Sequence, residues 1–426
     1  MPGIINKKHD SGYPPDWKKI GYQNTPESTL NGFEYALNIK NNWDTSAVTH
    51  TERYRGDLNL MYFPKNIDMS NLITIDRMFQ ASNIEYIELD LSSTQTAQAV
   101  FTDCHNIRYA KITNIGITPQ LYNLNNFFLE CHALEKVEID LDYIQSDTTI
   151  NKMFCNCYNL KEFQYDNSTI SSTGFIKSAT QTFENCYKME KLTFEDEKCE
   201  NIGCYGIGKN TDTGCDLKIR IGYNTSGSLA SFMASKLKHC NVWVRKITNC
   251  QSIFENVVFV FGSGNQYLFT GNNVNCSYMF KNAKLNGNLT NLYVNPTNAN
   301  GMFDGLLFTN ITDKTISLGS NATTVDFSNC TNMQNAFANT NATKIEKIED
   351  ADFSSVTNFN NTFYNSPDFD SDTVNGILKA LTTASSYSGT KTLATLGFTS
   401  ANYPASDIQN LSNYTLFTGA GWTIGY

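Results

Sequence analysis

The chain is poor in charge, proline and histidine, and these shortages exclude several classes of protein. Charged residues make up only 17% of the 426 residues, against roughly 25% in a typical soluble domain. The formal net charge is −9, which disfavours a nucleic-acid-binding protein because such proteins need a basic surface to neutralise phosphates. Aromatic residues contribute 12%, and this apolar content argues against a disordered chain. The polar filler is asparagine and threonine, with 52 and 45 residues.

No apolar run in the sequence is long enough to cross a membrane. The longest strongly apolar run covers residues 257–261, whereas a membrane-spanning helix needs roughly 20 apolar residues. The sequence starts MPGIINKKHDSGYPP, in which a lysine pair is not followed by an apolar segment, so no secretion signal is expected. These features predict a protein that is made in the cytoplasm and is not inserted into a membrane.

The twelve cysteines follow neither a disulfide framework nor a regular zinc site. A zinc site would have to use Cys199, Cys204, Cys215 and Cys240, whose spacing is irregular and includes no CxxC pair. Buried thiols are the favoured interpretation, and no metal or other cofactor is predicted. P-loop, nucleophile-elbow and HExxH motifs are also missing, so the sequence does not predict an enzyme.

A short line anchored on phenylalanine recurs along most of the chain. Its clearest copies read VFTDCHNIRYAKI, FFLECHALEKVEI, MFCNCYNLKEFQY and TFENCYKMEKLTF. The anchors are Phe79, Phe101, Phe128, Phe154, Phe183, Phe232, Phe254, Phe280, Phe303, Phe337 and Phe363. Most gaps between them are 22 to 29 residues, and the 49-residue gap after Phe183 fits two coils with one anchor lost. Repeats of roughly 20–29 residues are typical of leucine-rich-repeat solenoids.

Each part of the line has a structural interpretation. The apolar residues at its end predict a short strand with alternate residues inward, as at Val137 and Ile139. Equivalent strands of stacked coils would form one parallel sheet, and the phenylalanines would stack on the opposite wall at a helical turn. Most residues three positions after the anchor are small: Ser82, Cys104, Cys131, Cys157, Cys186, Ser235, Ala283, Thr340 and Ser366. This position predicts a second buried row, in which cysteine packs as a small hydrophobe.

The pattern resembles the BspA-like leucine-rich repeat over roughly residues 57–370. The resemblance implies a repeat solenoid of about twelve short coils. We place this solenoid at 46–370, between an aromatic N-terminal cap or attachment segment at 1–45 and a helical C-terminal cap at 371–426. Terminal caps are expected because an open solenoid exposes an apolar end. Ile377, Leu378 and Leu381 recur at helical spacing, with Asp372 and Thr373 as candidate N-caps.

Both ends of the chain carry a further resemblance. The line IGYQNTPESTLNGFEYALNIKNNWDTS and the closing segment that ends in GWTIGY look like the ends of repeat-containing tail proteins of bacteriophages that infect gut bacteria. This resemblance implies a non-enzymatic virion protein, tail-associated or fibre-like, that is made in the host cytoplasm. Its partners would be other virion proteins or a host-surface glycan or protein, with self-association left open. A tail-associated polysaccharide depolymerase and a bacterial BspA-like surface adhesin are the alternatives.

The outward strand positions predict rows of alternating charge. Consecutive coils place Glu85, Arg108, Glu135, Lys161 and Glu190 at one position, and Tyr86, Tyr109, Lys136, Glu162 and Lys191 at the next. Self-neutralising rows explain the alternation better than an ionic docking surface does. From about Phe254 onward these positions lose charge, and Asn291 and Tyr293 there suit neutral glycan recognition or ordinary ladders. The candidate binding residues are Tyr86, Tyr109, Lys136, Asn291 and Tyr293.

His105 and His132 share one repeat position, directly after two of the row cysteines. Two histidines one coil apart could hold a metal ion. Tyr158 and Tyr187 occupy the same position in the next coils, so a partly exposed aromatic ridge is the favoured interpretation.

Overall fold

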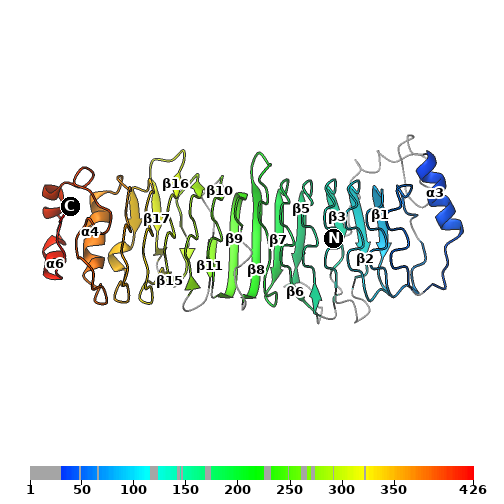
Figure 1. Ribbon diagram of the computed structural model, residues 1–426, viewed down its shortest axis with the longest axis horizontal. Helices are drawn as coiled ribbons and strands as arrows, with labels where there is room; N and C mark the ends of the chain where they lie inside the picture. The colour runs from blue at the N-terminus through cyan, green and yellow to red at the C-terminus, as the bar shows by residue number, and fades with distance from the viewer. Residues whose placement is uncertain are drawn as a thin grey trace. The chain divides into compact units, whose positions relative to one another are not determined.

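The chain forms two compact units, Met1–Ile207 (unit 1) and Gly208–Tyr426 (unit 2). The computed structural model describes residues 30–47, 49–64, 67–115, 123–141, 144, 147–167, 174–224, 232–247, 249–260, 266–269, 274–290, 292–320 and 323–426. Both units are built from stacked coils with parallel strands (Figure 1), so the predicted repeat solenoid is confirmed. The division of the solenoid at residue 207 was not predicted from the repeat.

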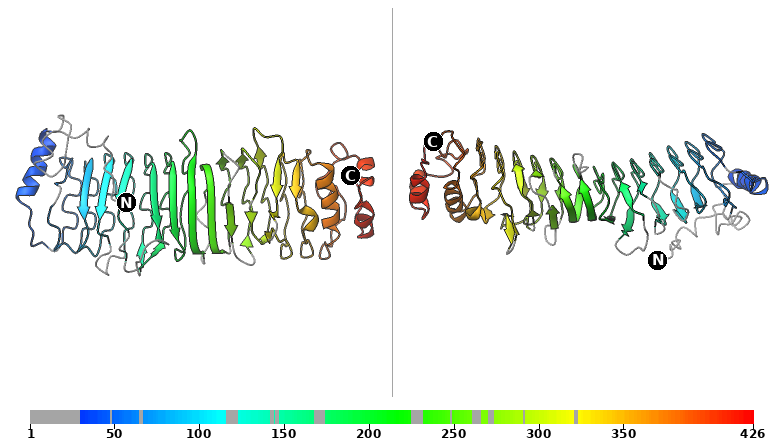
Figure 2. Two further views of the ribbon diagram at one scale, coloured as in Figure 1. Left: turned by 180° about the vertical axis from the view of Figure 1, so that it is seen from behind. Right: turned by 90° about the horizontal axis from the view of Figure 1, so that it is seen from below.

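Unit 1 begins with helix α3 (Leu30–Asn41), which lies at the end of the first coils (Figures 1 and 2). Its strands are β1 (Tyr86–Asp90), β2 (Tyr109–Thr113), β3 (Lys136–Ile139), β4 (Thr148–Thr149), β5 (Glu162–Asp166), β6 (Ile176–Ser178) and β7 (Lys191–Asp196). Strands β1, β2 and β3 form one parallel sheet, β5 pairs with β7, and β4 pairs with β6. Equivalent residues of neighbouring coils are therefore direct neighbours.

Unit 2 carries the longest strands, β8 (Cys215–Asn224) and β9 (Lys236–Ile247). The others are β10 (Val258–Phe259), β11 (Gln266–Phe269), β12 (Val274–Asn275), β13 (Lys284–Leu285), β14 (Leu292–Tyr293), β15 (Pro296–Asn298), β16 (Leu307–Phe308), β17 (Thr315–Ser317), β18 (Gly319–Ser320), β19 (Thr323–Thr324) and β20 (Lys344–Glu346). A parallel sheet runs β8-β9-β10-β13-β16, with β11 on β9 and β14 on β11. Strands β12–β15 and β17–β20 are parallel pairs, whereas β18 and β19 are antiparallel.

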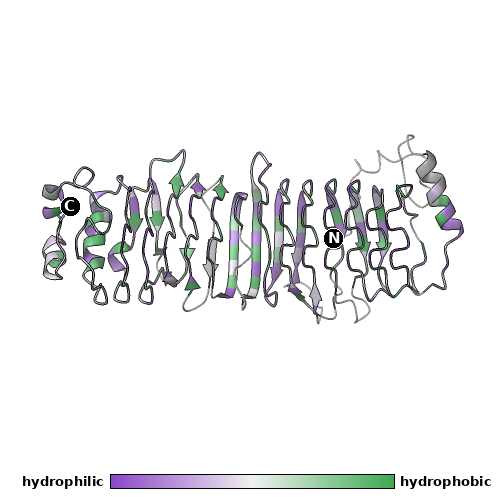
Figure 3. Cartoon of the chain, viewed as in Figure 1, coloured by the Kyte–Doolittle hydropathy of each residue, from purple (hydrophilic) through white to green (hydrophobic). Residues whose placement is uncertain are grey.

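The strands alternate between inward apolar and outward polar residues, as the sequence predicts. Hydropathy colours alternate along β8 and β9 (Figure 3), and Ile87 and Leu89 of β1 are buried between more exposed neighbours. Strand β3 departs from this pattern, because Val137 and Ile139 are only partly buried. The predicted inward position of these two residues is therefore only partly realised.

The predicted phenylalanine stack is confirmed in both units. In unit 1 the rings of Phe79, Phe101, Phe128, Phe154 and Phe183 follow one another with centroids 5.2, 5.2, 5.7 and 5.7 Å apart. In unit 2 the rings of Phe232, Phe254, Phe280, Phe303, Phe337 and Phe363 are 5.6, 5.1, 5.8, 5.1 and 5.6 Å apart. All of these rings are buried, so each unit has one continuous aromatic wall.

The anchor segment is a chain of tight turns and not the predicted helical turn. Around Phe79, alternate amides donate to the carbonyl three residues earlier, as Met78 N does to Ile75 O and Ser82 N to Phe79 O. The intervening amides donate to the next coil, in the pairs Ile75–Thr96 (3.0 Å), Arg77–Gln98 (2.9 Å), Phe79–Val100 (3.0 Å) and Ala81–Thr102 (2.8 Å). An α-helix would direct every amide back along its own segment, so it could not join the coils.

This alternation requires left-handed backbone two residues before and two residues after the anchor. Lys152 (φ 56°) and Asn156 (φ 63°) flank Phe154, and most other coils repeat this pair. Asparagine tolerates positive φ better than other side-chain-bearing residues. Among the described residues, 11 of the 23 non-glycine positions with positive φ are asparagine. The turn geometry thus explains part of the unusual asparagine content.

The second predicted row, of small residues, is also confirmed and has a hydrogen-bonding role. Cys104, Cys131, Cys157 and Cys186 are fully buried. Each thiol donates to the carbonyl of the preceding coil's anchor, with sulfur–oxygen distances of 2.9, 3.0, 3.1 and 3.3 Å respectively. In unit 2 the Ser366 hydroxyl makes the same bond to Phe337 O at 2.7 Å. A small residue with a donor therefore fits this position better than alanine does.

Two coils have a residue other than phenylalanine at the anchor position, so the sequence search did not find them. Tyr54 stacks on Phe79 at 5.8 Å, and its amide donates to Met78 O, so it anchors an earlier coil. Cys204 is the anchor lost after Phe183, because Phe183 N donates to Gly203 O and Asn185 N to Tyr205 O. These bonds match those around every neighbouring anchor.

The C-terminal cap of unit 2 is helical, as predicted. It contains α4 (Ser371–Leu381), α5 (Ala405–Gln409) and α6 (Tyr414–Gly419) after the short 3-10 helix η3 (Ile348–Asp350). Ile377, Leu378 and Leu381 are buried. The predicted N-caps are wrong by two or three positions, because Asp370 is the cap and accepts from Thr373 N at 2.7 Å. Trp422 is buried and donates to Leu381 O, which fixes the chain end under α4.

Replacing Phe154 by alanine should lower the free energy of unfolding by about 3–5 kcal/mol, since a buried ring between two stacked neighbours leaves a cavity. Chemical denaturation of the purified chain measures this change. Tyr205→Ala, at a 41% exposed ring of the same unit, is the matched control and should change stability by less than about 0.5 kcal/mol. Equal losses in the two variants would contradict the aromatic wall.

Substitutions of Asn256, which has a φ of 59°, test whether the left-handed positions disfavour other residues. Asn256→Val should cost about 1–2 kcal/mol because a β-branched residue is strained there, whereas Asn256→Gly should be nearly neutral. The control is Asn241→Val, the same change at an exposed position of strand β9, where valine is favoured. Denaturation midpoints report all three, and equal effects of valine at 256 and 241 would argue against backbone strain.

Candidate functional surfaces

Three of the predicted binding residues lie side by side on strands β1, β2 and β3. Backbone register pairs Tyr86 with Tyr109 and Tyr109 with Lys136. Tyr109 is only 1% exposed, so the prediction that it presents an exposed ring is wrong. Tyr86 and Lys136 are half-buried, and their role in binding stays a prediction.

Tyr86 belongs to the N-terminal cap rather than to an open platform. Its ring stacks on buried Tyr62 of the preceding coil, with centroids 6.5 Å apart. Ala36 and Leu37 of helix α3 pack in the same apolar cluster. Helix α3 thus covers the start of this tyrosine column, as expected of a cap.

The other two predicted residues belong to unit 2. Tyr293 ends strand β14, is half-buried and pairs in register with Leu268 of β11. Asn291 lies outside the described residues. Tyr293 therefore belongs to unit 2, whereas Tyr86, Tyr109 and Lys136 belong to unit 1.

Charge on the strand face of unit 1 is largely paired along its rows. Lys161 Nζ lies 3.2 Å from Glu135 Oε2 of the preceding coil, as the alternating sequence predicts. A further row was missed, since Glu88, Lys111 and Glu138 are in register on β1, β2 and β3. Glu138 also forms an ion pair with Lys136, in which Oε1 and Nζ are 2.9 Å apart. These pairs favour the structural interpretation over ionic docking.

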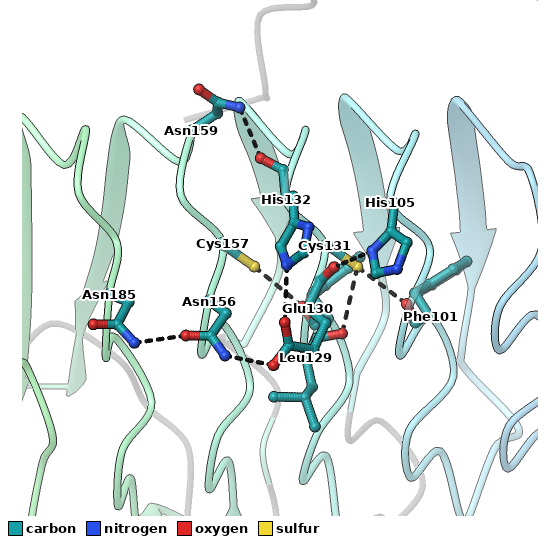
Figure 4. Close-up of polar contacts among 11 residues, drawn as sticks. Phe101, His105, Leu129, Glu130, Cys131, His132, Asn156, Cys157, Asn159 and Asn185 are labelled. Carbon is teal, nitrogen blue, oxygen red and sulfur yellow. Dashed lines mark hydrogen bonds and ion pairs between the residues drawn. The ribbon is translucent and has the colours of Figure 1, made fainter.

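The predicted aromatic ridge is present, and its two histidines are shown with Glu130 in Figure 4. The rings of His105, His132, Tyr158 and Tyr187 stack in sequence with centroids 4.6, 4.5 and 5.2 Å apart. His105 Nδ1 lies 2.9 Å from Glu130 O, and His132 Nε2 lies 2.8 Å from Glu130 Oε2. The two histidine rings are parallel within 13°, a stacking arrangement and not one that converges on a metal ion.

An asparagine row runs beside this ridge. Asn156 donates to Glu130 Oε1, and Asn185 donates to Asn156 Oδ1 at 2.6 Å. These residues occupy the left-handed position after their anchors. The ridge and the row together make a regular, partly exposed strip that repeats with the coils.

The cysteines have the chemistry of core residues. All twelve are buried as thiols. Burial raises the pKa of Cys104 and of Cys155 to about 12, and it raises the pKa of Cys240 well above its usual value. Such thiols are protonated at neutral pH and are poor nucleophiles. Cys199 Sγ donates to Asn201 O, and no cluster of three or more metal-binding side chains occurs in the described part of the chain.

Asp196 is a buried carboxyl of unit 1 with several hydrogen-bond donors around it. It is 1% exposed and accepts from Ile176 N, Lys198 N, Asn167 Nδ2 and Tyr165 Oη at 2.9–3.2 Å. Burial raises the pKa of this carboxyl. Because its oxygens already hold four donors away from solvent, Asp196 stabilises a loop and is closed to a substrate.

A polar cleft of about 660 Å³ lies between strand β20 and helix α4 in unit 2. Its charged lining residues are Lys344, Lys347, Lys379, Glu346, Glu349 and Asp372. Lys344 is 3.2 Å from Glu346, and Lys379 is 3.6 Å from Asp350 outside the lining. None of the described lining residues is aromatic, although a groove that cleaves a glycan would be expected to combine carboxylates with aromatic rings.

His50 is an unusual titratable group in the first coil. It is 6% exposed, meets the Trp43 ring edge-on at 4.7 Å and lies 2.8 Å from Arg53 Nη1 through Nε2. Burial, and then the Arg53 guanidinium, lower the pKa of His50 from 6.5 to about 4. The ring is therefore neutral in the folded protein, and it accepts from the guanidinium.

A protein-family profile described as "Mycoplasma protein of unknown function, DUF285" matches residues 307–386. No curated protein and no solved structure matches the chain. The matched segment contains the coils of Phe337 and Phe363 and the whole of α4, which supports a BspA-like repeat protein. Within the described residues, no helix is long and apolar enough to span a bilayer.

The neutral His50 predicts that the first coil loses stability in acid. Between pH 6.5 and about 4 the unfolded chain binds a proton at His50 that the folded chain does not, so the free energy of unfolding falls as pH falls through this window. Hydrogen exchange of residues 49–64 at pH 7 and pH 5, corrected for intrinsic rates, should show the loss. His50→Phe should reduce it, whereas His105→Phe at the exposed ridge should not. An undiminished loss in His50→Phe would refute the assignment.

Proposed function

We propose that the chain is a non-enzymatic binding protein of a bacteriophage virion, tail-associated or fibre-like. Its coil surface would contact other virion proteins or a glycan or protein of the host surface. The observation that carries the proposal is that exposed chemistry is laid out in rows that repeat from coil to coil. The ridge of His105, His132, Tyr158 and Tyr187 is one such row.

Rows suit binding better than catalysis. An active site needs groups of different chemistry that converge on one point, often with shifted pKa values. Here the shifted groups, such as Asp196 and Cys104, are buried and hydrogen-bonded inside the coils. A long repeated face instead offers many weak contacts to an extended partner, as solenoids do with their surfaces.

The virion part of the proposal rests on the resemblance of the two chain ends to phage tail proteins. The N-terminal line contains helix α3, which packs on the first coils of unit 1. The C-terminal line contains α4 and the buried Trp422. This packing supports a role of both segments as caps that also attach the chain to other subunits.

The two rivals make different use of the same surface. A depolymerase would use the cleft beside α4, where Glu346, Glu349 and Asp372 gather. A bacterial adhesin would use the rows in the way proposed here but would be attached to a cell. The first rival differs in chemistry and the second only in location, so each needs its own test.

Purified phage particles from a culture that expresses the gene should contain the chain, because a virion protein is incorporated at fixed stoichiometry. Peptide mass spectrometry of density-banded particles measures this. The purified chain should also compete with particles for adsorption to host cells. Absence of the chain from the particles, together with its presence on bacterial envelopes, would favour the adhesin.

Incubation with host capsular polysaccharide provides the enzymatic counter-test. The chain should release no new reducing ends. Release that is lost in Glu349→Gln but kept in Asp352→Asn, a matched carboxyl outside the cleft lining, would replace the binding proposal with the depolymerase.

A further inference from the structure

Five asparagines of unit 2 form one in-register row over five successive coils. Each lies five residues before its phenylalanine anchor: Asn249, Asn275, Asn298, Asn332 and Asn358. Their backbones are paired as parallel partners at each step, 249 with 275, 275 with 298, 298 with 332 and 332 with 358. The corresponding row of unit 1 is mixed and reads Thr74, Thr96, Asn123, Thr149 and Ser178.

The backbone holds all five side chains in one conformation. Each Oδ1 accepts from the amide two residues later, at 3.0, 3.1, 3.0, 3.1 and 3.0 Å along the row. This local turn fixes the plane of the carboxamide, so each Nδ2 has one defined direction. Asn275 and Asn358 donate weakly to glutamines of the preceding coil, at 3.4 and 3.3 Å.

The remaining amide donors face solvent. All five asparagines are half-buried. Within the described residues, Asn249, Asn298 and Asn332 have no acceptor for Nδ2. A half-exposed donor of fixed direction can bind a ligand without first losing side-chain entropy. The row therefore presents preorganised donors at a spacing of one coil, about 4.8 Å.

Threonines beside the row supply acceptors. The hydroxyls of Thr297, Thr331 and Thr357 donate to the carbonyl of the preceding coil, at 3.1, 3.2 and 3.1 Å. Because the single proton of each hydroxyl is used inside the stack, each oxygen can only accept from a ligand, and it keeps both lone pairs for this. Thr331 and Thr357 are exposed. Donors and acceptors thus alternate across the strip.

A third row completes the strip on the other side of the asparagines: Gln251, Ser277, Asn300, Gln334 and Asn360. We call the three rows together the amide face. None of its members is charged. The corresponding positions of unit 1 include Asp76 and Lys177, so the lack of charge is a property of unit 2 and not of the fold.

We propose that the amide face binds a neutral, linear polysaccharide that runs across the coils. Sugar hydroxyls both donate and accept, and they match alternating amide donors and hydroxyl acceptors. Successive sugars of an extended chain would meet successive coils. A nucleic acid or an acidic glycan would require basic residues, and a protein hot spot would require exposed aromatic residues or arginine. The inference rests on the proposed binding function and names the ligand class for one surface.

The test is native electrophoresis of the full chain in gels that contain hydroxyethyl cellulose, galactomannan or sodium alginate. Migration should be retarded in at least one neutral gel and not in alginate. The double variant N298D/N332D keeps the Oδ1 acceptor of each local turn but replaces the outward donor with a charged oxygen. Its affinity should be at least tenfold lower. N256D/N282D adds the same charge at the left-handed positions after two anchors and should behave as the parent chain.

Four outcomes decide the inference. The inference is supported if N298D/N332D loses affinity for the neutral polysaccharide, N256D/N282D does not, and the melting temperature of N298D/N332D is unchanged. Equal affinity of both double variants, retardation in alginate alone, or no retardation in either neutral gel overturns it. If adsorption competition succeeds while the neutral gels fail, the virion proposal stands and the amide-face proposal falls. If the chain is absent from particles but its retardation in a neutral gel depends on Asn298 and Asn332, the virion proposal falls and the amide-face proposal stands.

Discussion

The hydrogen bond that leaves the anchor amide and enters the next coil is the constraint on which the rest of this structure depends. Phe79 N to Val100 O and Phe154 N to Thr182 O are two instances of it. It sets the separation of neighbouring coils, so the anchor rings must stack at 5.1–5.8 Å. Bonds of this kind use every second amide of the turn, and the intervening amides donate to carbonyls three residues earlier in the same turn. Only a backbone with left-handed residues on both sides of the anchor satisfies both sets.

The composition follows from that backbone. Asparagine is the residue that most readily accepts positive φ while adding a side chain, and glycine takes the position where a ring approaches. At Gly301 a Cβ would come within 2.6 Å of the Tyr278 ring of the preceding coil. Lys152 and Tyr278 occupy left-handed positions without such an advantage. Their strain is sustained because bonds to neighbouring coils over-determine the turn.

The repeat period, the ring stack and the thiol row could be predicted from sequence because one residue type marks each of them. Tyr54 and Cys204 could not, since the ladder around the anchor is made by main-chain groups and does not require phenylalanine there. The prediction of a helical turn at the anchor was wrong because left-handed residues cannot be recognised from the spacing of apolar residues in the sequence. Tyr109 looked exposed because alternation predicts on which face of a strand a side chain lies but not how far it is exposed there. The row of Asn249 to Asn358 could not be recognised in a sequence with so many asparagines. It became visible only from the backbone pairing of neighbouring coils.

The same stacking that makes rows inevitable also decides which rows can bind. A charged row neutralises itself when opposite signs alternate, as Lys161 and Glu135 do, and a partner would have to break those pairs. A thiol row is sealed in the core. An asparagine row behaves differently, because the local turn satisfies its acceptor and leaves its donor outside. At Asn298 and Asn332 no acceptor within the described residues occupies Nδ2, so a ligand has no existing bond to displace there. Asn275 and Asn358 make only long bonds, of 3.4 and 3.3 Å, to glutamines of the preceding coil. Binding capacity in this solenoid should therefore follow rows whose polar groups are only half satisfied by the stack, and not the rows of highest charge.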